Sequence, residues 1–433
     1  MPQTSEVWDL IVIGAGAAGM MAVQRAAELG LRALLLEKNR KPGVKILISG
    51  GTRCNLTHNT NVAGILEAFG EQAKFLRPAV REFPPERVVE HFHQLGVATK
   101  LEPNGKVFPA TDRAYDVQQA LWKSLLNSGA EAVLGEAVTQ VNREPDSWLV
   151  TTAMDRYRAR RLLVTTGGCS YSGCGTTGDG YAWMRELGHT IIEPRPALVP
   201  LTSPDAWVRE LTGVTLEDVV LRAVPANFDI DCTDVNERLA RVRKGATITR
   251  RTALLFTHFG LSGPAAMDVS RAVTRAEQPS DVQLVCDLLP DETVESLESR
   301  LQHECQQQGG RTTGRWLSEL IPQRLAVAAL ERLRLDALGR LAELSRDARR
   351  GILRELKSMR LRVDGSRGFA KAEVTAGGVC RDEVNPKTME SRLVPGLYLA
   401  GELLDVDGPI GGFNFQAAFS TGRLAAQSVR NAN

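Results

Sequence analysis

The chain has 433 residues, of which 43% are apolar and 24% are charged, and its formal net charge is only +2. These values are typical of globular proteins, and they exclude disordered and collagen-like chains. A chain of this length exceeds the size at which one hydrophobic core stops growing, so about two or three domains are expected.

The sequence shows no targeting or membrane segment. The apolar stretch at 10–22 is interrupted by three glycines and follows acidic residues, unlike a signal peptide. No run approaches the ~20 apolar residues of a membrane helix. Seven scattered cysteines without a Cys-x-x-Cys pair favour a reduced, cytoplasmic location. We therefore expect a cytoplasmic protein with neither a metal site nor a membrane partner.

The N-terminal part alternates strands and helices. Apolar patterning predicts a strand at 8–13, a turn at 14–19, a helix at 20–29 and a strand at 31–36. Further strands are expected at 131–141, 148–150 and 160–164, the last leading into a Thr-Thr-Gly-Gly sequence. Together these elements indicate a doubly wound α/β layer.

The composition changes after this layer. Short β-prone runs at 214–220, 221–224 and 282–285 lie within 194–290, whereas 291–365 has long stretches with apolar residues at helical spacing, including Leu325, Ala329, Leu333 and Ala337. Strand, loop and helix patterns return at 396–400, 401–414 and 415–429. The fold class is therefore α/β: a discontinuous Rossmann-like domain (1–193 and 366–433) interrupted by a β-rich, barrel-like domain (194–290) and a helical domain (291–365).

The turn at 14–19 matches the Gly-x-Gly-x-x-Gly dinucleotide fingerprint between a strand and a helix. Gly14 permits the tight turn, Gly16 lets the backbone approach a pyrophosphate, and Gly19 allows close packing of helix and strand. Glu37, 18 residues beyond Gly19, can accept hydrogen bonds from ribose hydroxyls and would repel a phosphorylated ribose. The alternative is a glycine-rich turn without a ligand.

Two further segments favour FAD over NAD. The strand at 396–400 ends in Gly401-Glu402, and the sequence Gly-Gly-Phe-Asn-Phe-Gln at 411–416 precedes a helix whose free N–H groups could face the flavin ring. The segment 45–55 offers cations and glycines for the pyrophosphate. The predicted FAD-binding residues are Gly14, Ala15, Gly16, Ala17, Ala18, Gly19, Glu37, Lys38, Lys45, Gly50, Gly51, Thr52, Arg53, Cys54, Val138, Thr166, Gly167, Gly168, Gly401, Glu402, Gly412, Phe413, Asn414 and Phe415.

With these motifs, the chain resembles the BaiN/RdsA family of NAD(P)/FAD-dependent oxidoreductases almost from end to end. The matching segments are 12–19, 45–57, 166–180 with the motif at 177–181, 256–264, 371–379 and 385–412. The resemblance implies a flavin fold with an inserted β-rich domain and an inserted helical domain. It also implies hydride delivery from flavin to a carbon–carbon double bond, either in bile-acid intermediates or in a uridine of large-subunit ribosomal RNA, with NAD(P)H as a transient electron donor.

The chain departs from the family pattern in three places. Thr52 stands where a third glycine is expected, His58 replaces a usual Asn, and 169–172 lacks the expected basic residue and proline. These departures concern substrate identity more than FAD binding.

Reduction of such an alkene also needs a proton donor. Cys54 and Lys371 are the predicted catalytic residues; the alternatives are a buried structural thiol and a surface cation. His258 is a third candidate, with a structural histidine as its alternative. Cys169 and Cys174 have the Cys-x4-Cys spacing of a redox pair but lie far from the first strand. A second glycine string at 173–178 follows small polar residues rather than a strand, and we interpret it as a loop.

Signals for a partner are modest. Between 324 and 367 there are 12 Lys or Arg against 6 Asp or Glu, a local charge of +6, which could meet RNA phosphates or form a solvated helix face. No DNA partner is indicated, and the oligomeric state stays open. The leading hypothesis is reduction of a ribosomal RNA uridine. The alternatives are a small-molecule enone reductase and a flavin-binding protein without turnover.

Overall fold

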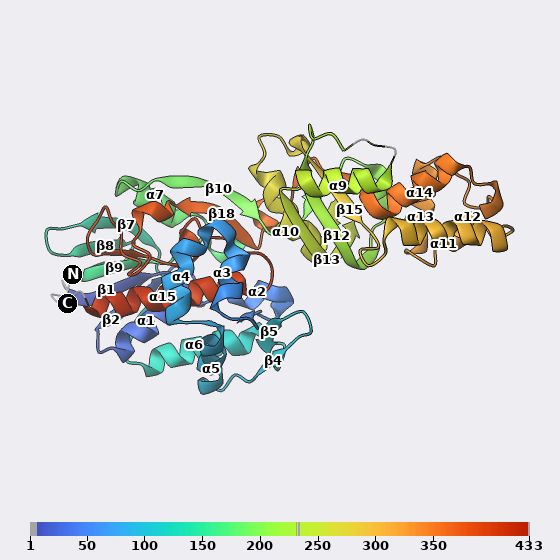
Figure 1. Ribbon diagram of the computed structural model, residues 1–433. Helices are drawn as coiled ribbons and strands as arrows, with labels where there is room; N and C mark the ends of the chain where they lie inside the picture. Colours follow the sequence, from blue (N-terminus) through green and yellow to red (C-terminus); the bar gives the residue numbers. More distant parts are fainter. Residues whose placement is uncertain (1–6, 231, 233, 432–433) are drawn as a thin grey trace. The chain divides into compact units, whose positions relative to one another are not determined.

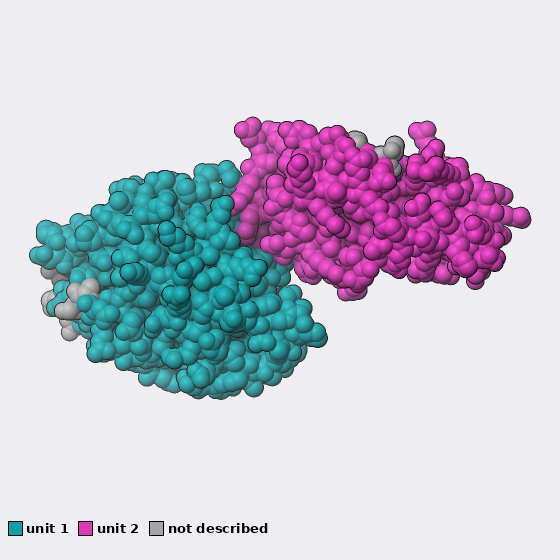
Figure 2. Space-filling model, viewed as in Figure 1, with its two compact units in different colours: residues 1–195, 373–433 teal, residues 196–372 magenta. Residues whose placement is uncertain are grey.

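The computed structural model describes residues 7–230, 232 and 234–431, and it divides into two compact units (Figures 1 and 2). Unit 1 comprises residues 1–195 and 373–433, and unit 2 comprises residues 196–372. None of the described helices combines the length and the apolar character of a bilayer-crossing segment.

A seven-stranded sheet forms the centre of unit 1. Its order is β6-β2-β1-β9-β8-β7, with β19 also paired to β9. The parallel strands are β1 (Val7–Ile13), β2 (Ala33–Glu37), β6 (Glu131–Leu134), β9 (Arg156–Val164) and β19 (Leu397–Leu399); β7 (Val138–Arg143) and β8 (Trp148–Thr152) are antiparallel. Leu10, Ile11 and Val12 of β1 are completely buried, as expected for a parallel strand covered on both faces.

The two ends of the chain pack together in unit 1. The first helix, α1 (Ala17–Glu28), lies beside the last, α15 (Phe413–Asn431), as Figure 1 shows in blue and red. A Cβ added at Gly422 of α15 would lie 2.3 Å from the Ala18 carbonyl oxygen, so only glycine permits this close approach. The other elements of unit 1 are α2 (Val44–Thr52), β3 (Thr57–His58), α3 (Val62–Phe69), α4 (Ala73–Glu82), α5 (Pro85–Gln94), β4 (Thr99–Leu101), β5 (Lys106–Pro109), α6 (Ala114–Asn127), α7 (Asp179–Glu186), β10 (Ile191–Ala197) and β18 (Val374–Val379).

Unit 2 is built on an antiparallel seven-stranded sheet with helices packed against it (Figure 1). The sheet order is β16-β15-β12-β13-β14-β11-β17, and no ladder joins its two end strands within the described residues. The strands are β11 (Leu201–Thr202), β12 (Thr215–Pro225), β13 (Ile248–Thr257), β14 (Gly260–Ser262), β15 (Val282–Asp287), β16 (Met359–Arg362) and β17 (Gly365–Ser366). The helices are α8 (Ala206–Glu210), α9 (Val235–Gly245), α10 (Gly263–Arg275), α11 (Val294–Gln307), α12 (Thr313–Leu317), α13 (Gln323–Arg332) and α14 (Arg346–Ser358).

One hydrophobic cluster in unit 2 joins residues of the sheet, such as Leu221 and Leu284, to residues of the helices, such as Leu325 and Leu356. Strand β16 comes from the segment expected to be helical, yet it pairs with β15. The separation of a β-rich from a helical domain at residue 290 therefore stays a prediction, and the shared cluster weighs against it.

The α/β class with a parallel Rossmann-like sheet is confirmed, but several predicted bounds are wrong. The strand expected at 131–141 is two strands, because Gly135 adopts a φ of +78° and the chain turns before β7. The runs at 214–220 and 221–224 form the single strand β12, and α13 ends at Arg332, so Leu333 and Ala337 lie beyond it. Helix α1 begins at Ala17, inside the predicted turn, and α15 begins at Phe413, inside the predicted loop.

Candidate functional site

The glycine turn between β1 and α1 has the geometry expected from the fingerprint. Gly14 has a φ of +104°, and a Cβ there would lie 2.7 Å from the Thr165 carbonyl oxygen. A Cβ at Gly19 would lie 1.9 Å from the Gly14 carbonyl oxygen. Larger residues at these two positions would therefore force the turn and the helix apart.

Gly16 differs from its neighbours because its surroundings are open. No described atom lies within 4 Å of an ideal Cβ at Gly16. Gly16 is the N-cap of α1, where no described side chain caps the helix and the first turn holds no acidic residue. The free N–H groups and the positive end of the helix dipole thus form a site suited to an anion such as a pyrophosphate.

Glu37 holds the turn from the end of β2. Its buried carboxylate accepts hydrogen bonds from the Ala15 N–H at 2.7 Å and from the Asn39 N–H at 2.8 Å. A carboxylate has about four lone-pair directions, so Glu37 could still accept bonds from ribose hydroxyls. The backbone before Val138 lies close by, because the Glu136 N–H donates to the Glu37 carbonyl at 3.0 Å.

The segment after β9 lies against the same turn. The Thr165 hydroxyl is 2.9 Å from the carbonyl oxygens of both Ile13 and Gly14. The neighbouring Thr166 hydroxyl is buried and has no hydrogen-bond partner among the described residues. Gly167 adopts a φ of +73°, and a Cβ at Gly168 would lie 2.3 Å from the Thr375 hydroxyl. Since buried hydroxyls are normally paired, the unpaired Thr166 hydroxyl beside the glycine turn is a candidate contact for a ligand.

Lys45 and Glu402 form a half-buried ion pair at 2.5 Å. Ser170 joins the pair: its Oγ lies 2.6 Å from Lys45 Nζ and donates to Glu402 Oε1 at 2.7 Å. The Thr375 N–H also donates to Glu402 Oε1, at 2.8 Å. Glu402 thus ties three distant segments together, and both charges are already paired within the protein.

The loop predicted at 45–55 begins as helix α2 and leaves helical geometry at Ser49. Gly50, Gly51 and Thr52 then adopt φ values of +54°, +67° and +68°. Arg53 points to an acidic neighbour, since its Nη1 lies 2.6 Å from Glu102 Oε1. The left-handed turn is a backbone feature that could border a cofactor, whereas the Arg53 charge is satisfied within the protein.

Lys38 is occupied in a similar way. Its Nζ donates to the Thr177 hydroxyl at 2.6 Å and pairs with Asp179 at the start of α7. It therefore links the end of β2 to α7.

The amino-terminal loop and the carboxy-terminal helix meet at Gly412. With its amide oriented so that both groups are paired, Asn55 accepts from the Gly412 N–H at 3.0 Å and donates to the Thr57 carbonyl at 2.9 Å. A Cβ at Gly412 would lie 2.6 Å from the Thr57 backbone. The Thr57 hydroxyl donates to Gln416 Oε1 at 2.6 Å. The start of α15 is therefore fixed by residues more than 350 positions earlier in the chain.

Aromatic and amide side chains complete this end of α15. Phe413 stacks on His58 with 4.9 Å between ring centroids, and His58 Nδ1 lies 3.2 Å from the Gly411 carbonyl oxygen. Asn414 holds the preceding loop by accepting from the Gly408 N–H at 2.8 Å, while Phe415 stacks on Phe419. At a rise of 1.5 Å per residue, Gly412 lies roughly 15 Å along α15 from Gly422, which touches α1.

The predicted proton donors differ in their exposure. Cys54 is completely buried, and burial raises the pKa of its thiol to about 12. Lys371 is exposed in unit 2, at the end of a short 3-10 helix (Phe369–Lys371), and His258 is exposed between β13 and β14 of the same unit. Catalytic roles for Cys54 and Lys371 stay predictions, and burial of the thiol weighs against Cys54.

Cys169 and Cys174 lack the features of a redox pair. Every described cysteine is a free thiol. Burial raises the pKa of both thiols, and the Glu402 carboxylate raises the pKa of Cys169 further, whereas reactive thiols have lowered pKa values. The glycine string at 173–178 overlaps a 3-10 helix (Ser172–Cys174) and leads into α7, as interpreted from the sequence.

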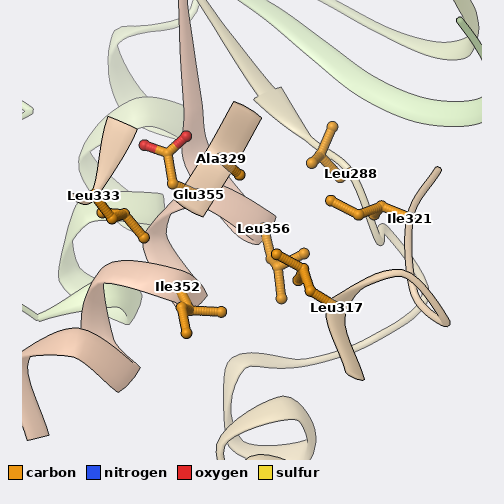
Figure 3. Close-up of a pocket in the computed structure, with 8 residues that line it drawn as sticks. All are labelled: Leu288, Leu317, Ile321, Ala329, Leu333, Ile352, Glu355 and Leu356. Atoms are coloured by element: carbon orange, nitrogen blue, oxygen red, sulfur yellow. The ribbon is translucent and has the colours of Figure 1, made fainter. Parts of the chain in front are cut away.

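A separate apolar pocket lies in unit 2 (Figure 3). Its only acidic lining residue is Glu355, whose pKa is raised by burial and whose carboxylate lies 3.3 Å from the Arg332 guanidinium. Because this carboxylate is paired and its surroundings are aliphatic, we interpret the pocket as part of the packing between α13 and α14. It is lined by Leu288, Leu317, Ile321, Ala329, Leu333, Ile352, Glu355 and Leu356.

Sequence reasoning missed Ser170 and Thr375, which hold Glu402. Neither is part of a spacing pattern that indicates this role. Thr375 lies in the segment at 371–379 and Ser170 in the segment at 166–180, both of which resemble the family. That resemblance was the available signal, although 169–172 departs from the family pattern.

Comparison with known proteins gives relatives over the full length of the chain. The chain is 30% identical over 433 residues to a ribosomal RNA dihydrouridine synthase of Escherichia coli K12, covering 98% of both chains. It is 29% identical over 421 residues to a 3-dehydro-bile acid delta(4,6)-reductase of Clostridium scindens, covering 96% of this chain and 98% of that one. Among solved structures, it is similar to a 3-ketosteroid-delta4-(5alpha)-dehydrogenase from Rhodococcus jostii RHA1, with 15% identity, coverage of 99% and 98%, and a TM-score of 0.49.

The glycine turn, Glu37 and the parallel sheet agree with the family comparison. The description of the matching family is HI0933-like protein Rossmann domain, and the match covers residues 8–428. The chain therefore belongs to the HI0933-like family.

Proposed function

We propose that this chain is an FAD-dependent oxidoreductase that reduces a carbon–carbon double bond, with a uridine of large-subunit ribosomal RNA as its substrate. The observation that carries the proposal is the full-length similarity to a ribosomal RNA dihydrouridine synthase and to a delta(4,6)-reductase. Dihydrouridine is uridine with one carbon–carbon double bond reduced. The two relatives therefore share one kind of chemistry, the addition of a hydride and a proton across an activated alkene.

The residues around the glycine turn fit FAD. The open backbone at Gly16 and the uncapped start of α1 would hold the pyrophosphate. Glu37 would accept hydrogen bonds from the adenosine ribose, and the unpaired Thr166 hydroxyl would bond to the same nucleotide. Two of these features are open backbone at Gly16, where a Cβ would meet no described atom, and a buried polar atom that lacks a partner within the described chain.

The start of α15 would lie at the ring end of the cofactor. The 15 Å estimated along α15 from the contact with α1 allows one extended nucleotide to reach from Gly16 to Gly412. The Gly412 N–H itself is taken by Asn55, so the N–H groups of the residues that follow would face the flavin. FAD, when bound, would supply the hydride, and the N-terminus of α15 would favour negative charge on the reduced ring.

The paired side chains have a positioning role in this proposal. Lys45 and Glu402 would fix the loops at 170 and 375 around the cofactor, and Lys38 would fix α7 against β2. Neither Lys45 nor Arg53 needs to bind phosphate directly, because both already contact carboxylates. NAD(P)H is the proposed electron donor, and Lys371 remains the proposed proton donor with an exposed side chain.

Three measurements test the proposal. The purified protein should be yellow, and NADH or NADPH should bleach the flavin absorbance under anaerobic conditions. Mass spectrometry of ribosomal RNA from a strain lacking the gene should show loss of one dihydrouridine, restored by the gene on a plasmid. If the dihydrouridine content is unchanged and the purified protein reduces enones, the substrate is a small molecule and not RNA. If the bound flavin is never reduced, the protein binds flavin without turnover.

A further inference from the structure

A cluster of aromatic and cationic side chains lies at one end of the sheet in unit 2. Phe259 is in the turn between β13 and β14, and the Arg367 guanidinium carbon lies 4.5 Å from its ring centroid. The neighbouring His258 ring meets Phe259 edge-on, with centroids 5.0 Å apart at 81°. Two chain segments more than a hundred residues apart thus build one small surface.

The sheet holds this surface in place before any ligand arrives. Strand β11 lies between β14 and β17 and pairs with both. The Ser203 N–H donates to the Phe259 carbonyl at 3.0 Å, and the Arg367 N–H donates to the Pro200 carbonyl at 2.9 Å. A surface whose backbone is already ordered loses less conformational entropy when it binds a partner.

The Arg367 charge is not neutralised. Arg367 and His258 are exposed, as is Lys371 four residues further along the chain, and neither Arg367 nor Lys371 has a carboxylate within ion-pair distance among the described residues. Two arginines above aromatic rings, Arg53 and Arg332, differ in this respect because each pairs with a glutamate. Arg53 lies over Phe108 and is bonded to Glu102, so its charge is already satisfied.

These properties fit an unpaired nucleotide better than an apolar ligand. A guanidinium plane and an aromatic ring are the two groups on which proteins stack unpaired bases, and the remaining positive charge can meet the phosphates. A base pair inside a duplex hides both faces of each base, so the surface would select single-stranded or looped RNA.

We propose that Phe259 and Arg367, with His258 beside the ring, form a stacking platform for an unpaired pyrimidine nucleotide of the RNA substrate. This inference rests on the proposed function, because it names how unit 2 would recognise that substrate. It concerns unit 2 alone, and it assigns a role to His258 other than proton donation.

The test measures RNA binding directly with the FAD-loaded, full-length protein. The probe is a fluorescein-labelled oligouridylate of about 12 nucleotides, within the range of single-strand site sizes, followed by fluorescence anisotropy at several salt concentrations. Phe259→Leu removes the ring and retains an apolar side chain. Arg367→Ala removes the planar cation, and Arg367→Lys retains only its charge. The matched control is Arg315→Ala, which removes one exposed charge in unit 2 outside the basic stretch at 324–367.

Loss of one stacking group should weaken binding by about tenfold in Phe259→Leu, with an unchanged salt dependence. Arg367→Ala should weaken binding at least as much and reduce the salt slope by about one, whereas Arg367→Lys should restore the slope without restoring the affinity. Arg315→Ala should change the affinity by no more than about twofold at the salt concentration of the cell, since one exposed charge is largely screened there.

The platform is refuted if Phe259→Leu and Arg367→Lys bind as tightly as the parent, or if Arg315→Ala is as weak as Arg367→Ala. Flavin absorbance and thermal unfolding check that each variant is folded; if Phe259→Leu does not load FAD, Arg367→Lys alone decides. The two proposals fail separately. If the platform variants weaken RNA binding but the protein reduces no alkene, the proposed function is wrong and the platform stands. If the protein reduces enones but does not bind RNA, the platform is wrong.

Discussion

Replacing Gly16 with alanine should weaken FAD binding and leave the protein folded, whereas replacing Gly19 should destabilise the protein itself. An ideal Cβ at Gly16 meets no described atom within 4 Å, and the φ of −79° there suits any residue. At Gly19 the added Cβ would lie 1.9 Å from the Gly14 carbonyl oxygen and 2.6 Å from the Thr165 hydroxyl. Two glycines of one motif should therefore respond in opposite ways to the same methyl group.

The magnitudes follow from these contacts. Overpacking typically costs about 1–3 kcal/mol, and a clash with a backbone oxygen places Gly19→Ala at about 3 kcal/mol. The better helix propensity of alanine offsets about 1 kcal/mol, so the free energy of unfolding should fall by about 2 kcal/mol and Tm by about 4–8 °C. Gly16→Ala loses only an N-cap preference, at most about 1 kcal/mol. Beside a bound pyrophosphate its methyl group should raise the Kd for FAD by about 5- to 150-fold.

The assay compares the two variants with the parent, first without and then with FAD. Thermal unfolding of the protein stripped of FAD gives Tm, and quenching of flavin fluorescence gives Kd. Parent-like FAD affinity in Gly16→Ala would show that the pyrophosphate does not pass this backbone. An equal loss of Tm in both apo variants would show that the methyl group at Gly16 meets protein, contrary to the geometry.

Further predictions concern single side chains. Glu37→Gln should raise the Kd for FAD by about tenfold in the same titration. The amide replaces one of the two carboxylate oxygens that accept hydrogen bonds from backbone N–H groups. An unchanged Kd would show that Glu37 does not bind the ribose. Iodoacetamide at pH 8 should label the half-buried Cys380 in the native protein and spare Cys54, whose buried thiol has a pKa raised to about 12. Peptide mass spectrometry measures the labelling of each cysteine, and faster labelling of Cys54 than of Cys380 would contradict the prediction. Burial lowers the pKa of His91 from 6.5 to about 4. Between these pH values the unfolded state therefore binds more protons than the folded state. The free energy of unfolding should fall by at most about 3 kcal/mol as the pH drops from about 6.5 to about 4. Urea melts at a series of pH values should show a smaller decline for His91→Phe. If the variant's free energy of unfolding depends on pH as the parent's does, another group takes up the proton.

The parts of the site that are local in sequence could be predicted. Gly14, Gly16, Gly19 and Glu37 belong to one strand-turn-helix-strand unit, and backbone geometry alone determines what each position requires. The partners of the charged residues could not be predicted, because they depend on tertiary packing. Lys45 binds Glu402, 357 positions away, and no spacing rule relates the two.

The errors in the bounds of the elements also have physical causes. Helix α1 begins directly after an N-cap glycine that makes no side-chain cap, so the usual Ser, Thr, Asp or Asn signal for its start was missing. Gly135, which adopts a left-handed conformation, was the signal for the break between β6 and β7. Apolar residues at 132–134 and 137–138 made the segment resemble one continuous strand. In unit 2, β16 follows α14 without a breaker residue, and only its pairing with β15 makes it a strand.

The contact between α1 and α15 sets the order in which a nascent chain can acquire its structure. Unit 2 is continuous in sequence and can fold as soon as it leaves the ribosome. Strand β19 and helix α15 emerge about 200 residues after the first part of unit 1 is finished, a delay of roughly 10–40 s at about 5–20 residues per second. During that interval Ala18 and the edge of β9 that pairs with β19 lack their final neighbours. Because the proposed cofactor site includes the start of α15, we expect FAD to bind late in biosynthesis, and truncations near the 3′ end of the message should yield colourless protein with a folded unit 2.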